Sequence, residues 1–431
     1  MTHGAHPTIV VIGAAGEVAR VAVRTLLRHQ PGYHLVLTDI NMRSLEEFAM
    51  SLPDARVTAR RLDLFDVDQA RDTIRGAAMV INGAGPFART AEPVIKACVA
   101  ERVDYLDYDD DPASTLAAIG AEAMLAASGI RCFKDCGHSP GFTNVLAVDV
   151  ANELDEVESL DVCWALGDEG PHVYGRAVIE HWLEVIQGPV PTWRTGRATA
   201  VEAFQASETY PLAGSLGNFR LYEVGHPEPI TLPRRFPHAA AIRCMGGLHP
   251  QPVNGLSRGI ADAVKRQAIT MDEAIGWAQR VFNDQSGPLK VWRHAVAGIR
   301  TQYRRGEISG SELREFIWMA ARKRHWAWRG AAAVKATGIK DGKRLTLMRR
   351  TPAPGPQSSM WTSLANCTGV SCAAFAGMAL TGGTSPHGLL FPEDWAEPLA
   401  FYHALIGVGV REEDVIEPLI RVSATPVTVP T

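Results

Sequence analysis

Residues Ile12-Gly13-Ala14-Ala15-Gly16-Glu17-Val18-Ala19 decide the fold, because they follow a short β-branched segment, Thr8–Ile12, and open a helical pattern. Glycine at position 13 allows a tight turn between strand and helix, and alanine at position 19 keeps the helix close to the strand. Glycine at position 16 lets the backbone approach a ligand, and the unpaired N–H groups of a first helical turn favour a phosphate group. The stretch therefore predicts a phosphate-binding turn, which also includes Ala15, Glu17 and Val18.

Strand and helix signals alternate over the first third of the chain. Further strands are expected at Tyr33–Thr38, Arg56–Leu62, Met79–Asn82, Val103–Leu106 and Ile130–Phe133, with helical segments between them. Strands separated by helices at this spacing form βαβ units, in which the strands are parallel. The fold class is therefore predicted to be α/β, with a doubly wound parallel sheet of the Rossmann type.

Asp39 closes the second predicted strand. A carboxylate at this point accepts hydrogen bonds from both hydroxyls of an adenosine ribose and repels a 2′-phosphate. Together with the glycine turn, it predicts a dinucleotide site with NAD(H) preferred. NADP(H) stays possible because the guanidinium of Arg43 is near enough in sequence to accept a 2′-phosphate, and Asp39 also fits the cap of a helix that begins near Arg43.

Two further segments at strand ends complete the expected cofactor site. Asp63, after the third strand, is placed to meet the adenine amino group, although an Asp at this position is nearly as often a turn residue. The fourth strand ends in small residues that allow a ribose and a nicotinamide to lie against the backbone at the switch point of the sheet. An ordinary glycine loop is the alternative for this segment, which comprises Gly83, Ala84, Gly85, Pro86 and Phe87.

Composition excludes several classes of protein. The 431 residues include 43 Lys and Arg against 47 Asp and Glu, a net charge of −4 that does not favour binding to a nucleic acid backbone. The apolar runs are shorter than the ~20 residues that span a bilayer, and the first residues lack the pattern of a signal peptide. Seven cysteines without a Cys-x-x-Cys pair, and histidines without metal-ligand spacing, predict neither a disulfide framework nor a metal site. A cytoplasmic protein without a membrane partner is expected.

Several motifs resemble those of the saccharopine dehydrogenase (saccharopine reductase-like) family. They are Gly13-Ala-Ala-Gly16-x-x-Ala19, Asn82-Gly-Ala-Gly85-Pro-Phe87, Tyr105-Leu106-Asp107 and the segment Cys136-Gly137-His138-Ser139-Pro140-Gly141-Phe142-Thr143-Asn144. The last of these is similar to the family's Gly-Phe-Asp-Pro-Gly-x-x-Asn segment. The resemblance is specific over residues 8–147 and patchy over the rest of the chain.

The resemblance implies a nicotinamide cofactor and hydride transfer at a C–N bond, an imine or a secondary amine, of a small amino-acid-derived substrate. It also implies three regions: a Rossmann domain at residues 1–137, an inserted α/β domain with a mixed sheet at residues 138–355, and a segment at residues 356–431 that returns to the Rossmann domain. The inserted domain would bind substrate and dimerise. Because Thr192–Arg243 is expected to form antiparallel strands with edges that must be covered, a homodimer is predicted.

The polar candidates for a substrate cleft include two departures from the family pattern. Ser139 stands where the family usually has Asp, and His138 replaces an aromatic residue. His138 is chemically suited to supply the proton that imine reduction needs, so both are candidate catalytic residues. Arg234 is suited to clamp a substrate carboxylate, although a solvated arginine is the alternative. The candidate substrate-binding residues are Asn144, His226, Glu228 and Arg234.

Two other functions remain open at this point. The same cofactor face would serve the reduction of a carbonyl or an activated C=C bond. The departures at His138 and Ser139 also fit a protein that senses a dinucleotide without turnover.

Overall fold

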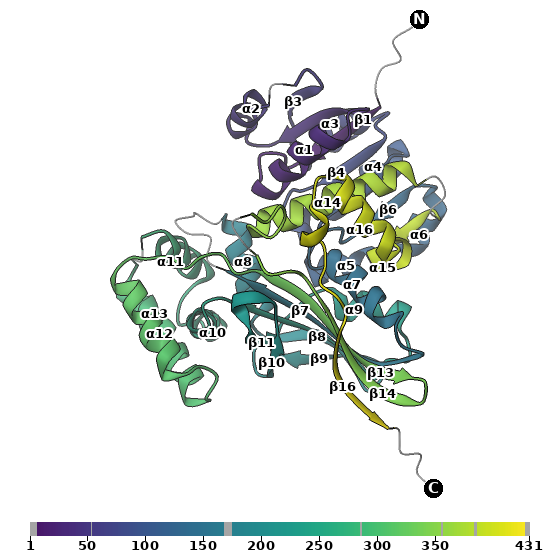
Figure 1. Ribbon diagram of the computed structural model, residues 1–431. Helices are drawn as coiled ribbons and strands as arrows, with labels where there is room; N and C mark the ends of the chain where they lie inside the picture. The colour runs from purple at the N-terminus through teal and green to yellow at the C-terminus, as the bar shows by residue number, and fades with distance from the viewer. Residues whose placement is uncertain are drawn as a thin grey trace, which may run out of the picture. The chain divides into compact units, whose positions relative to one another are not determined.

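The computed structural model describes residues 7–52, 54–167, 175–284, 287–354, 357–382 and 386–426 (Figure 1). The chain forms two compact units, and each has its own sheet. The first unit comprises Met1–Asp149, Ile230–Arg235 and Leu364–Val415, and the second comprises Val150–Pro229, Phe236–Ser363 and Ile416–Thr431.

The first unit contains a seven-stranded parallel sheet in the order β15-β6-β5-β4-β1-β2-β3. Strand β1 lies in the middle and pairs with both β2 and β4, so the strand order reverses direction at β1. This arrangement confirms the predicted doubly wound sheet, with β15 added from a distant part of the chain. The strands are β1 (Thr8–Ile12), β2 (His34–Asp39), β3 (Val57–Arg61), β4 (Met79–Asn82), β5 (Asp104–Asp107), β6 (Arg131–Phe133) and β15 (Gly388–Leu390).

Apolar helix faces and the central strands form the core of the first unit. Val10, Val80 and Tyr105 of the sheet pack with Val94 and Cys98 of a helix in one buried cluster. The helices of this unit are α1 (Glu17–His29), α2 (Met42–Met50), α3 (Val67–Ile74), α4 (Phe87–Glu101), α5 (Pro112–Gly120), α6 (Glu122–Ser128), α7 (Phe142–Ala151), α14 (Leu364–Thr381), α15 (Pro392–Trp395) and α16 (Pro398–Gly407).

Among the described residues, α14 is long and apolar enough to cross a membrane by length and composition alone. It packs against α1 and α16 instead. A Cβ atom on Gly369 would lie 2.6 Å from Cβ of Val21, so glycine at this position lets α14 and α1 approach closely. The apolar composition of α14 is therefore explained by its place inside the first unit.

The second unit contains a mixed nine-stranded sheet whose main path is β10-β11-β12-β7-β13-β14-β16. Strands β7 and β12 are parallel and the other pairs are antiparallel, which confirms the predicted mixed sheet. The strands are β7 (Glu156–Leu166), β8 (Pro189–Arg194), β9 (Arg197–Glu202), β10 (Ser207–Pro211), β11 (Asn218–Glu223), β12 (Ala241–Leu248), β13 (Ala331–Lys340), β14 (Lys343–Arg350) and β16 (Ile420–Pro426). The helices are α8 (Arg176–Val185), α10 (Pro252–Lys265), α11 (Met271–Asp284), α12 (Leu289–Arg304) and α13 (Gly310–Ala321), while α9 (Glu228–Arg235) belongs partly to each unit.

The two units differ in their bounds from the predicted regions 1–137, 138–355 and 356–431. Most of α7 belongs to the first unit, because its apolar residues Val145, Leu146 and Val148 are buried there. The end of the chain does not return to the first unit as a whole, because β16 pairs with β14 in the second sheet. The predicted boundary at residues 355 and 356 lies outside the described residues.

Candidate functional site

The glycine turn after β1 has the geometry expected of a phosphate-binding turn. Gly13 has φ of +72°, and a Cβ atom there would lie 2.7 Å from the backbone nitrogen of Ala84, so this position requires glycine. Gly16 has φ of −70° and precedes α1 without a side chain to cap its first turn. Since Gly16 and Glu17 are exposed, the N-terminus of α1 is open to an anion from solvent.

Asp39, at the end of β2, is tied to this turn. Its Oδ2 atom accepts a hydrogen bond from the backbone N–H of Ala15 at 3.1 Å, and its Oδ1 atom accepts one from the N–H of Asn41 at 2.8 Å. The cap of α2 is Asn41, whose side chain accepts from the N–H of Ser44, so Asp39 is not the helix cap. Asp39, which is predicted to bind the ribose, therefore lies beside the turn that is predicted to bind phosphate.

Arg43 is not directed to Asp39 in the structure. Its side chain is 90% exposed, and its Nε atom lies 3.2 Å from Glu47 one helical turn further along α2. Such an exposed pair contributes little to stability, so Arg43 is held only weakly in this position.

The loop after β4 borders the glycine turn. The backbone N–H of Gly83 donates to the carbonyl of Ile12 at 2.8 Å. A Cβ atom on Gly83 would lie 2.2 Å from the hydroxyl of Tyr108, and the ring of Tyr108 makes an edge contact with Phe87 at 5.7 Å. Because β1 pairs with both β2 and β4, the turns after these three strands lie at one edge of the sheet, at its switch point.

Asp63 has a local role in the structure. Its carboxylate accepts from the backbone N–H of Phe65 at 3.1 Å, and its own N–H donates to the side chain of Gln69 at 2.7 Å. These contacts are those of a turn residue, which was the alternative to adenine recognition.

His138 and Ser139 lie in a tight turn between β6 and α7, in the first unit. The N–H of Gly137 donates to the carbonyl of Pro140 at 3.1 Å, and the buried ring of His138 stacks on Phe142 with centroids 6.3 Å apart. A Cβ atom on Gly137 would lie 3.2 Å from Cβ of Tyr108. Tyr108 therefore contacts both this turn and the loop after β4, which places His138 and Ser139 at the same edge of the sheet as the cofactor candidates.

Asn144 is fully engaged within the first unit. Its Oδ1 atom accepts from the N–H of Gly141 at 3.0 Å, and its Nδ2 atom donates to Glu393 at 2.8 Å and to Thr231 at 3.3 Å. Burial, together with the charge of Asp394, raises the pKa of Glu393 to about 7. Asn144 thus organises a buried polar cluster and is not presented to solvent.

Arg234 has a protein partner for its guanidinium. The two terminal nitrogens lie 2.5 and 3.2 Å from the two carboxylate oxygens of Glu122, and the group also lies over the ring of Phe391 at 5.6 Å. The bidentate carboxylate clamp predicted for a substrate is therefore formed with the chain's own Glu122.

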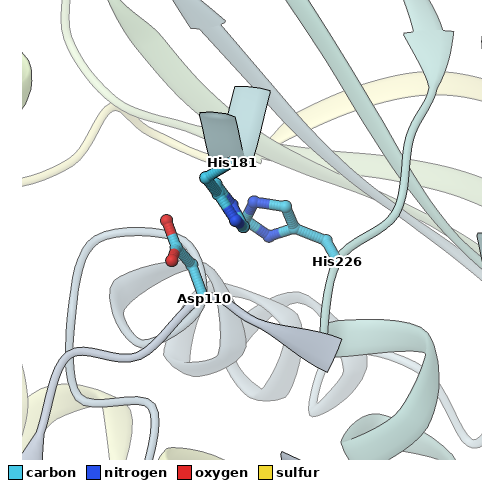
Figure 2. A group of neighbouring side chains, drawn as sticks. All are labelled: Asp110, His181 and His226. Carbon is cyan, nitrogen blue, oxygen red and sulfur yellow. The ribbon is translucent and has the colours of Figure 1, made fainter. Parts of the chain in front are cut away.

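His226 and Glu228 form a buried pair in the second unit. Nδ1 of His226 lies 3.0 Å from Oε2 of Glu228, and the ring of His226 contacts the rings of Trp164 at 5.5 Å and His181 at 6.2 Å. Figure 2 shows the two imidazoles side by side; the third residue drawn there, Asp110, belongs to the first unit. Glu228, the first residue of α9, thus holds the imidazole of His226.

Cys244 lies beside this pair, and its sulfur and one atom each of His226 and Glu228 lie within 4.8 Å of one another. Burial and the charge of Glu228 raise the pKa of Cys244 well above its usual value, so the sulfur is a thiol. Sequence spacing did not reveal this group, since β12 brings Cys244 to the other two residues through sheet pairing.

A buried lysine in the first unit was not predicted from the sequence. Nζ of Lys134 lies 2.7 Å from Asp107, 2.5 Å from Asp109 and 3.8 Å from Asp135, and all four side chains are fully buried. Burial opposes the charge on Lys134, but the three carboxylates outweigh it and raise the pKa of the lysine well above its usual value. The available signal was that Asp107 and Lys134 each stand at the carboxyl end of one of two neighbouring parallel strands.

Comparisons with known proteins agree with this geometry. Residues 9–129 match the family model described as the saccharopine dehydrogenase NADP binding domain. A probable mitochondrial saccharopine dehydrogenase-like oxidoreductase of Arabidopsis thaliana is 30% identical over 115 residues, which are 24% of this chain and 25% of that protein. This chain therefore matches about a quarter of the length of that relative.

The fold of the whole chain is similar to that of saccharopine dehydrogenase (L-Glu forming) from Saccharomyces cerevisiae. The two structures have a TM-score of 0.62 over 97% of this chain and 100% of the yeast chain, at 14% sequence identity. These findings agree with the resemblance found in the motifs: residues 9–129 match the saccharopine dehydrogenase NADP-binding domain, and the whole chain has a fold similar to that of the yeast enzyme.

Proposed function

We propose that the protein is an NAD(P)-dependent oxidoreductase that transfers hydride at a C–N bond of a small amino-acid-derived substrate. One observation carries this proposal: the turn at Gly13–Gly16, the carboxylate of Asp39 and the loop after β4 lie together at the switch point of the parallel sheet. This is where open α/β sheets bind their ligands.

The residues present fit a nicotinamide dinucleotide. The open N-terminus of α1 after Gly16 suits a pyrophosphate, and Asp39 suits an adenosine ribose. The small residues Gly83, Ala84 and Gly85 suit the nicotinamide end of the cofactor. When bound, the dinucleotide supplies or accepts the hydride, and the protein contributes orientation, electrostatics and exclusion of water.

We further propose that NAD(H) is preferred over NADP(H). A 2′-phosphate beside Asp39 would lose a hydrogen bond and meet a like charge, and Arg43 is an exposed side chain paired with Glu47. The matching family model is described as NADP binding, so the two cofactors must be compared directly.

Reduction of a C–N double bond also requires a proton at nitrogen. We assign this role to His138, with Ser139 beside it, because Tyr108 joins their turn to the loop after β4. Asn144 donates a hydrogen bond to Glu393, and Arg234 donates to Glu122, so we assign both residues a structural role in the first unit. His226, held by Glu228, is the candidate substrate-binding group of the second unit.

The assembly and compartment are proposals of the same kind. A homodimer would cover the exposed edges of the second sheet, and light scattering would then give twice the chain mass of 46.7 kDa. All seven cysteines are buried and none of them forms a disulfide, which fits a reducing compartment, and we propose the cytoplasm. The Arabidopsis relative is named as mitochondrial, so cell fractionation is the test.

The test of the reaction is a set of turnover assays that follow nicotinamide absorbance. Secondary amines derived from amino acids should reduce NAD+, and the matching imines should oxidise NADH. Turnover with ketones or activated alkenes but with no amine or imine would contradict C–N chemistry. Tight cofactor binding without turnover of any of these substrate classes would contradict an enzyme and support a dinucleotide sensor.

A further inference from the structure

The cluster of Lys134 with its three carboxylates has an unusual charge balance. One lysine faces Asp107, Asp109 and Asp135, and none of the four side chains is exposed. Burial raises the pKa of Asp109 to about 7 and that of Asp135 well above its usual value, so burial works against full ionisation of the three carboxylates. Replacing buried ionic groups with apolar side chains is often neutral or stabilising, so stability alone does not account for this cluster.

A chain of hydrogen bonds leads from the cluster to the loop after β4. The hydroxyl of Tyr105 donates to Oδ2 of Asp107 at 2.7 Å, the same oxygen that Lys134 contacts. Nδ2 of Asn82 donates to the hydroxyl of Tyr105 at 3.1 Å, and Oδ1 of Asn82 accepts from the backbone N–H of Ala84 at 3.2 Å. The side chains of Lys134, Asp107, Tyr105 and Asn82 are all fully buried, whereas Ala84 lies in a loop whose next two residues are exposed.

Asp107 also fixes the end of the neighbouring strand. Its Oδ1 atom accepts from the N–H of Asp135 at 2.8 Å, just after β6. Asp135 has φ of +63°, a left-handed conformation that costs free energy outside glycine and that persists only where surrounding contacts hold it. The hydroxyl of Thr115 supplies a further contact by donating to Asp135 at 3.1 Å. One carboxylate thus connects the ends of β4, β5 and β6.

We infer that Asp107 and Lys134 are positioning residues for the nicotinamide half of the cofactor, acting on Ala84 and its loop through Tyr105 and Asn82. This inference rests on the proposed function, because that function places the nicotinamide along Gly83–Gly85. None of these four hydrogen bonds reaches Gly16 or Asp39, where the adenosine half of the cofactor is proposed to bind. The network should therefore affect one half of the dinucleotide and leave the other unchanged.

The test compares two ligands on one variant. Tyr105→Phe keeps the aromatic ring and removes the hydroxyl that links Asn82 to Asp107. NADH contains both halves of the cofactor, whereas ADP contains only the adenosine half and a pyrophosphate. Calorimetry should show NADH binding weakened about 10-fold in Tyr105→Phe, as expected for loss of a buried hydrogen-bond link, and ADP binding within about twofold of wild type. Tyr33 directly precedes β2, at the amino-terminal end of that strand, whereas the cofactor is proposed to bind at the carboxyl ends. Tyr33→Phe should therefore change neither affinity.

Circular dichroism establishes whether each variant is folded at the assay temperature. If Tyr105→Phe is not folded, Asn82→Ala cuts the next link, and the same two affinities are measured. Equal weakening of NADH and ADP would show a general structural effect and overturn the inference, as would unchanged binding of both ligands. Failure of the wild-type protein to bind NADH would instead overturn the proposed function, so the two failures are distinguishable.

Discussion

The carboxylate of Asp39 accepts a hydrogen bond from the backbone N–H of Ala15 at 3.1 Å, which joins the end of β2 to the glycine turn that follows β1. The two residues are far apart in sequence and meet because β1 and β2 are adjacent parallel strands. The carboxylate proposed to bind ribose and the turn proposed to bind phosphate are thereby held side by side by the fold itself, which would reduce the ordering that binding requires.

Gly16 should be required for nucleotide binding but not for folding. Its φ of −70° is accessible to any residue, and a Cβ atom would meet only the carbonyl oxygen of Gly13, at 3.2 Å. A Gly16→Val side chain would occupy the space of the pyrophosphate, so calorimetry should detect no NADH binding while circular dichroism stays that of wild type. Undiminished affinity for NADH in a folded Gly16→Val protein would contradict the assignment of this turn to phosphate binding. Gly32→Val is the matched control, because nothing lies within 4 Å of a Cβ atom at Gly32.

Gly13 should instead contribute to the stability of the first unit. Gly13→Ala places a side chain at φ of +72° and at 2.7 Å from the nitrogen of Ala84. Strain of this kind costs about 1–3 kcal/mol, and the steric contact adds to it. Thermal denaturation should therefore show a lower Tm for Gly13→Ala and an unchanged Tm for Gly32→Ala. Equal Tm values for wild type and Gly13→Ala would contradict the close packing of the two loops.

The buried carboxyl group of Glu393 should make stability depend on pH. Its pKa is about 7 in the folded protein against 4.5 for the ordinary group, so between these values the folded state binds more protons than the unfolded state. The free energy of unfolding then falls as pH rises from about 5 to 8. Glu393→Gln removes this titration. Its free energy of unfolding, relative to that of wild type, should therefore rise by up to about 3 kcal/mol between pH 5 and pH 8.

Unfolding measured at pH 5, 6.5 and 8 checks this expectation. Glu397→Gln, at an exposed glutamate of the same region, is the matched control for the substitution itself. A difference between Glu393→Gln and wild type that is the same at all three pH values would show that Glu393 is ionised throughout.

Arg234 should behave as a surface residue of the first unit. Its pair with Glu122 is partly exposed, with side-chain exposures of 32% and 43%. Arg234→Ala should therefore lower the free energy of unfolding by only about 0–1 kcal/mol and leave the KM of any substrate within about twofold. An increase in KM of tenfold or more with unchanged kcat would instead indicate that Arg234 binds the carboxylate of a substrate.

Much of the first unit is predictable from the sequence because its signals are local. The glycine turn, the strand that ends at Asp39 and the alternation of strands with helices all follow from residues close together in the chain. The seventh strand, β15, is not predictable in this way, since it joins β6 from more than 250 residues away. The partner of Asn144 is missed for the same reason, because Glu393 follows β15.

The polar clusters show a second limit of sequence reasoning. Asp107 and Lys134 each look like ordinary strand-end residues, and only the pairing of β5 with β6 brings them into contact. Likewise, Arg234 is suited to a substrate carboxylate by its chemistry, and only the fold reveals that Glu122 already occupies it. Residue type predicts what a side chain is able to bind, whereas its actual partner depends on tertiary contacts.

We propose above that the turn at Gly13–Gly16 and the carboxylate of Asp39 form an NAD(H) site. The measurement that tests it most directly is the pair of dissociation constants for NADH and NADPH, in one buffer, for wild type and Asp39→Ser. Wild type should bind NADH at least ~10-fold more tightly, a difference of about 1.4 kcal/mol, and Asp39→Ser should lose most of this preference. Binding of neither nucleotide, tighter binding of NADPH by wild type, or a full NADH preference in Asp39→Ser would contradict the account.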